Sequence, residues 1–79
     1  MLNEYEELIQ EVDRLISAPE SQREEEGVYA NTSQLRFLMK KIKSSGGQKS
    51  SLIGIEKFVA DISSSDGRLL RKLDDFMSS

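Results

Sequence analysis

Residues 52–76 read LIGIEKFVADISSSDGRLLRKLDDF, and this stretch contains the pattern on which the fold depends. Apolar side chains recur in it at alternating steps of three and four residues, which is the spacing of a coiled-coil seam. A helix with such a stripe is not stable alone in water, so other helices or a second copy must cover it. We call this series the apolar seam: Leu52, Ile55, Val59, Ile62, Leu69, Leu73 and Phe76, with the charged Asp66 at the remaining position.

The phase of the apolar seam is unbroken, and this favours one long helix over about residues 51–77, with a kink near 63–67. The alternative is a break into two helices at 63–67, because serine and aspartate favour helix caps and glycine is a poor helix former. With a continuous helix, Asp66 is a buried polar contact that sets the register. With a break, it is an exposed cap residue.

Two earlier helices are predicted from capping pairs followed by apolar stripes. Asn3 with Glu6, and Asn31 with Gln34, have the spacing at which the asparagine side chain caps a helix start. They predict helices over residues 3–17 and 32–43, joined by a polar, acidic segment 19–27 that forms a loop or a weak turn of helix. A Gly-Gly turn follows the second helix. The fold class is therefore an all-α bundle of three helices, or four if the last one breaks.

The length and composition indicate one small soluble domain over residues 1–79. A chain of this size buries only about 60% of its unfolded surface and has room for one core. It has no cysteine, which fits a reducing compartment. The first 13 residues carry five acidic side chains and no basic one, unlike a secretory signal, and no apolar run approaches the ~20 residues of a membrane span. We expect a cytoplasmic protein, with a nuclear or virus-encoded origin as alternatives.

The charges are strongly segregated along the chain. Residues 1–26 contain nine acidic and two basic side chains, whereas residues 27–50 contain five basic and no acidic ones. We expect the basic side chains to face the acidic first helix, within the chain or across a dimer. Nucleic acid and a membrane surface are alternatives, although a pI of about 4.9 and the absence of Trp and His argue against nucleic acid. The candidate anion contacts are Arg36, Lys40, Lys41, Lys43 and Lys49.

Catalysis has little support in this composition. The absence of His and Cys removes the commonest general base, the commonest metal ligand and the thiol nucleophile. Glu4, Glu7 and Glu11 share one helix face and could approach a divalent ion, but a solvated face is the simpler interpretation. The turn at Gly46 and Gly47 lacks the glycine spacing of a phosphate loop. We therefore predict no catalytic residue, no cofactor, no metal site and no small-molecule substrate.

These observations predict a non-catalytic protein-interaction module, such as an adaptor or regulatory subunit, that offers part of its apolar seam to a protein partner. We also expect a homodimer, because the seam is longer than one short chain readily covers. One alternative is a nucleic-acid or anion-binding regulator that uses the basic second helix. Another is a small chaperone or anti-activator that masks a helix of a client protein.

Overall fold

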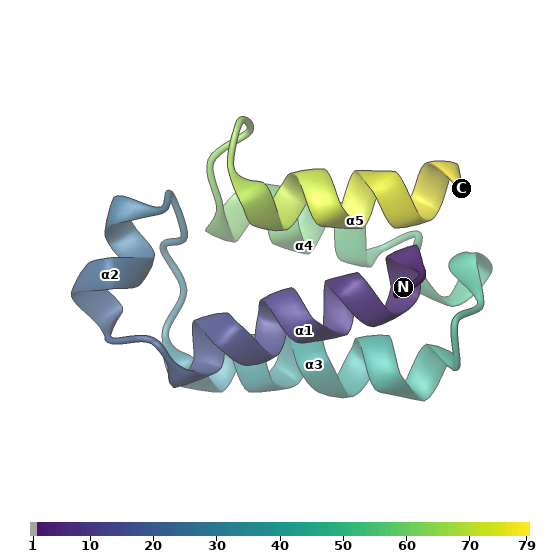
Figure 1. The fold of residues 1–79 in the computed structure, drawn as a ribbon, viewed down its shortest axis with the longest axis horizontal. Coiled ribbons are helices and arrows are strands. Elements are labelled where there is room, and N and C mark those ends of the chain that lie inside the picture. The colour runs from purple at the N-terminus through teal and green to yellow at the C-terminus, as the bar shows by residue number, and fades with distance from the viewer. Residues whose placement is uncertain (1) are drawn as a thin grey trace.

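The computed structural model describes residues 2–79, and this part of the chain forms five α-helices and one short 3₁₀ helix, η1. The all-α class is confirmed, but the expected number of three or four helices is wrong. The bundle has two layers: α1 lies beside α3, and α5 lies beside α4 (Figure 1). Helix α2 caps one end, and the C-terminus lies at the other. The elements are α1 (Glu4–Ser17), α2 (Glu20–Glu25), α3 (Thr32–Ser45), η1 (Lys49–Leu52), α4 (Ile55–Ile62) and α5 (Arg68–Ser78).

The boundaries of α1 and α3 follow the predicted caps. The backbone N–H of Glu6 donates to the side chain of Asn3 over 2.8 Å, which satisfies one of the free N–H groups at the start of α1. At α3 the capping box is complete, since Asn31 and Gln34 bond each other's backbone N–H groups. Gly46, at φ 60°, ends α3 in the left-handed conformation that glycine adopts at low cost.

The acidic segment 19–27 contains a short helix with one buried side chain, so of the two expected alternatives a turn of helix describes it and a solvated loop does not. Helix α2 follows Pro19, and Arg23 in its middle is only 5% exposed. The guanidinium of Arg23 donates to the carbonyl oxygen of Ala30 over 3.1 Å and to the hydroxyl of Thr32 over 3.0 Å. A helix of six residues has little stability of its own. These bonds to Ala30, just before α3, and to Thr32, its first residue, therefore help to hold α2 in place.

The predicted long helix over 51–77 is also wrong, because the chain reverses at 63–67. Ser63 is extended, and its hydroxyl donates to the carbonyl oxygen of Val59 over 2.6 Å, which closes the end of α4. Ser63 also forms an isolated antiparallel bridge with Val28. A 27-residue helix would be about 40 Å long, whereas the longest extent of the molecule is 31 Å. The reversal lets α4 and α5 lie side by side over α1 and α3 (Figure 1).

The break places Asp66 in an exposed turn outside the core. Its carboxylate accepts a hydrogen bond from the hydroxyl of Ser64, and this bond lowers the pKa of the Asp66 carboxyl below its ordinary value. Asp66 is therefore not a buried contact that sets the register of a continuous helix. The alternative of a break at 63–67 with an exposed Asp66 describes the structure.

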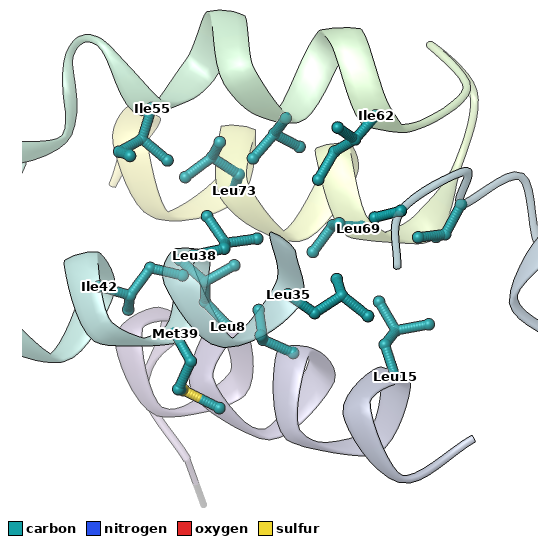
Figure 2. Close-up of a cluster of buried hydrophobic side chains, with 14 of the residues drawn as sticks. Leu8, Leu15, Leu35, Leu38, Met39, Ile42, Ile55, Ile62, Leu69 and Leu73 are labelled. Carbon is teal, nitrogen blue, oxygen red and sulfur yellow. The ribbon is translucent and has the colours of Figure 1, made fainter. Parts of the chain in front are cut away.

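The core lies between the two helix layers and contains every apolar residue of the seam. Figure 2 shows Leu8, Leu38 and Leu73 converging from α1, α3 and α5. The reversal turns both halves of the seam toward the same interior, where other members of the core pack against them. Sixteen apolar residues are buried: Leu8, Val12, Leu15, Val28, Ala30, Leu35, Leu38, Met39, Ile42, Leu52, Ile55, Val59, Ile62, Leu69, Leu73 and Phe76.

Substitutions at three glycines should separate the effects of backbone strain and of close packing on the free energy of unfolding. Gly46 has φ 60° with open space around it, so Gly46→Ala should lower the free energy of unfolding by about 1 kcal/mol. Gly27 has φ 80°, and an added Cβ would lie 2.9 Å from the Cβ of Ser64, so Gly27→Ala should cost about 2–3 kcal/mol. Urea denaturation measures both changes.

Gly54→Ala is the matched control, because Gly54 has φ −74° and an added Cβ would meet no atom within 4 Å. We expect a change within about 0.5 kcal/mol, or a small gain in stability. Equal losses at Gly27 and Gly54 would contradict the close contact between the segment before α3 and the reversal at 63–67.

Candidate interaction surfaces

The residues proposed from sequence to bind a partner through the apolar seam lie in the interior. Leu52, Ile55, Val59, Ile62, Leu69, Leu73 and Phe76 are all between 0% and 8% exposed. Asp66, the eighth member of that candidate site, lies apart from them in the exposed turn. A surface open to a partner in this conformation is therefore formed by other side chains.

The five candidate anion contacts separate into one group and two isolated side chains. Lys41 lies over the ring of Phe37, 5.4 Å from its centroid, on the flank of α3 that faces α4. Lys49 lies at the end of the bundle, 6.0 Å from the ring centroid of Phe76. The remaining three share the outer side of α3 and are exposed: Arg36, Lys40 and Lys43. We call these three residues the basic edge.

The acidic first helix does not neutralise the basic edge within the chain, contrary to expectation. Two of its acidic side chains pair with α5 instead: Glu7 lies 3.3 Å from the ammonium of Lys72, and Glu11 lies 3.0 Å from the guanidinium of Arg68. None of the ion pairs within residues 2–79 involves the basic edge. Tyr5 lies on the flank of α1 that meets α3, because its hydroxyl donates to the carbonyl oxygen of Ile42 over 3.0 Å. The partly buried side chains of α1 that pack against the core are Tyr5, Ile9 and Ile16.

A buried acid, Glu11, forms the centre of the charged cluster between α1, α2 and α5. Its side chain is 3% exposed, although the sequence places it on a solvated face. The Glu11 carboxylate accepts hydrogen bonds from Arg14 and forms an ion pair with Arg68. Arg14 also donates to Glu26 over 2.6 and 3.0 Å. We call Glu11, Arg14, Glu26 and Arg68 the charged cluster.

Hydrogen bonding within the charged cluster shifts two pKa values in opposite directions. The bond from Arg14 lowers the pKa of the Glu26 carboxyl below its ordinary value. The bonds to Glu26 and Glu11 raise the pKa of the Arg14 guanidinium above its ordinary range. These groups stay ionised near neutral pH, so the cluster links α1 to α2 and α5 electrostatically.

A groove of about 440 Å³ runs beside the charged cluster, between α1 and α5. Its charged walls contain both signs, and several of those charges already pair with one another. A second hollow of about 460 Å³ lies where α2 meets the 63–67 turn. The groove is lined by Leu2, Glu7, Gln10, Glu11, Asp13, Arg14, Arg68 and Lys72.

The described part of the chain forms no group of three acidic side chains that could hold a metal ion. Of the three candidates Glu4, Glu7 and Glu11, the last two bind different cations on α5. Within residues 2–79, no helix has the length and apolar content needed to cross a membrane.

Sequence reasoning missed the buried cation Arg23, which lies among solvated acidic residues in the sequence. Its Nε is buried without a hydrogen-bond partner, while its two terminal nitrogens bond Ala30 and Thr32. Local sequence contains one signal for it: Arg23 is the only basic side chain within residues 19–27. That signal does not reveal burial, because a single arginine among acidic residues is common on solvated surfaces.

The chain matches no protein-family model, no curated protein and no solved structure. Any statement about its function therefore depends on the surfaces described above.

Glu11→Gln tests the energetic role of the charged cluster, with Glu7→Gln as its control. Glu11 is buried, so loss of its charge leaves Arg68 unpaired and weakens the hold on Arg14. We expect the free energy of unfolding in urea to fall by about 1–3 kcal/mol. Glu7 is exposed, and Glu7→Gln should cost at most about 1 kcal/mol. Equal, small losses would show that the cluster contributes no more than an ordinary surface ion pair.

The pair between Arg14 and Glu26 should make stability depend on pH. Folding lowers the pKa of the Glu26 carboxyl, so its contribution is complete above the unfolded pKa of about 4.3 and disappears as the pH falls through the folded value. The parent protein should therefore exceed Glu26→Gln in stability at pH 7, and this difference should shrink below about pH 4.3. Thermal melts of both proteins between pH 7 and pH 2 measure it. A difference that stays constant over this range would contradict the assignment.

Proposed function

We propose that this protein is a non-catalytic interaction module that binds an acidic protein surface through the basic edge of α3. The observation that carries the proposal is that Arg36, Lys40 and Lys43 are exposed and outside all ion pairs found within residues 2–79. Three like charges within two helical turns repel one another, and an anionic surface placed against them relieves that repulsion.

Burial of the apolar seam supports a contact on the outside of the bundle. All seven apolar seam residues pack in the interior, so their release would require the helices to separate. The absence of His and Cys from the sequence supports binding rather than catalysis. A protein surface fits better than a nucleic acid, because the net charge is −3 and no exposed Trp or His accompanies the cations.

A fluorescently labelled helical peptide, in which turns of glutamate alternate with turns of leucine, is a direct probe for binding of an acidic helix by the basic edge. Fluorescence anisotropy should detect binding to the parent protein, and Arg36→Glu with Lys40→Glu should weaken it at least about tenfold. Lys57→Glu with Arg71→Glu is the matched control, because it reverses one Lys and one Arg at exposed positions on α4 and α5. The control should bind like the parent.

Equal weakening by both double variants would overturn a specific role for α3, since it would reduce binding to the overall charge. Absence of peptide binding together with steeply salt-dependent binding of duplex DNA would replace the protein partner with a nucleic acid.

A further inference from the structure

We infer that the acidic surface bound by the basic edge belongs to a second copy of this chain, so that two copies pair through the face formed by α1 and α3. This inference rests on the proposed function and identifies the partner. The two-fold axis of the pair runs parallel to α1 and α3. In this arrangement, α1 of each copy covers α3 of the other.

The face formed by α1 and α3 has an acidic edge, a basic edge and an apolar strip between them. Glu6 and Asp13, which we call the acidic edge, are exposed on the outward side of α1 and take no part in the ion pairs with α5, although Asp13 also lines the groove beside the charged cluster. The basic edge occupies the outward side of α3. The half-buried Ile9 and Ile16 lie on the flank of α1 that meets α3, and Met39, on the neighbouring flank of α3, is 9% exposed.

Symmetry selects one way in which two such faces can pair. A two-fold axis parallel to the helices exchanges the two edges, so the acidic edge of each copy meets the basic edge of the other. A two-fold axis perpendicular to the helices and within the interface would place acid on acid and base on base. Like charges opposed across an interface repel one another, which rules against that second arrangement.

The register of α1 and α3 also matches this pairing. The two helices run antiparallel, and the bond from Tyr5 to Ile42 fixes which turns lie side by side (Figure 1). Glu6, one residue after Tyr5, is level with the turn of α3 that holds Lys40 and Lys43. Asp13, about two turns further along α1, is level with the turn that holds Arg36. Because the parallel two-fold axis preserves height along the helices, each acid meets a base of the other copy.

Exposed ion pairs contribute little each, so they choose the orientation, and the half-buried Ile9 and Ile16 supply the apolar contact. We therefore expect a dimer in the micromolar range that weakens as salt screens the charges. Analytical ultracentrifugation between micromolar and millimolar concentration should detect species of twice the 8.9 kDa chain mass. Dimerisation should be stronger at low salt.

Two complementary charge reversals test the geometry. Arg36→Glu with Lys40→Glu leaves Lys43 as the one cation of the basic edge and gives both edges a net negative charge, whereas Glu6→Lys with Asp13→Lys makes both edges basic. Each variant alone should therefore dimerise at least about tenfold more weakly. An equimolar mixture of the two should recover dimers, because a mainly acidic face then meets an all-basic one. Lys57→Glu with Arg71→Glu should dimerise like the parent. Recovery in the mixture also excludes misfolding as the cause of the loss.

A monomeric parent at millimolar concentration would overturn this inference, as would a dimer that neither double variant weakens or a mixture that fails to recover. These outcomes are separable from failure of the proposed function. A monomer that still binds the acidic peptide through Arg36 and Lys40 overturns the dimer alone. A chain that neither dimerises nor binds the peptide overturns both.

Discussion

The reversal at 63–67 is the constraint on which the rest of this structure depends. It divides one continuous apolar pattern between two short helices and turns both toward the same interior. Backbone hydrogen bonds hold it: Tyr29 donates to Ile62 over 2.7 Å, and Ser64 donates to Gly27 over 2.6 Å. Gly27, at φ 80°, allows the close approach of the two segments. Without this reversal, half of the seam would extend beyond the helices that cover it.

The charges of α1 and α3 have different structural consequences, although they are opposite in sign and the helices are neighbours. Glu7 and Glu11 of α1 pair with cations of α5, so they orient the two layers relative to each other. The basic edge of α3 lies outside the bundle and contributes no ion pair to it within residues 2–79. The first group therefore selects helix neighbours, whereas the second leaves three exposed cations outside the ion pairs of the described bundle.

Two arginine side chains, one buried and one partly exposed, attach the shortest α-helix to the bundle. Arg23 points inward and bonds the segment before α3, while Arg14 on α1 bonds Glu26 at the end of α2. Helix α2 buries only Arg23, so polar bonds hold it where apolar contacts are few. Breaking a buried polar contact is costly because the remaining partner stays desolvated. The position of α2 is therefore specified by directional hydrogen bonds and an ion pair more than by buried apolar area.

Local sequence determined the features that depend on neighbouring residues. The caps at Asn3 and Asn31, the left-handed turn at Gly46 and the apolar faces of α1 and α3 involve side chains within one or two turns of each other, so spacing alone predicted them. The burial of the seven apolar seam residues was likewise predictable from their spacing, although Asp66 had the same spacing and lies in the exposed turn. Spacing also predicted that Arg36, Lys40 and Lys43 share one side of α3, where all three are exposed, whereas their binding of an anion stays a prediction.

Tertiary structure decided what depends on distant segments. The phase of the seam favoured a continuous helix, yet the bridge between Val28 and Ser63 and the short span of the bundle made the break more stable. In the same way, the burial of Glu11 and Arg23 follows from cations and carbonyl groups that approach only after the helices pack. Sequence spacing describes one helix at a time, whereas the choice of neighbour depends on the free energy of the whole packed chain.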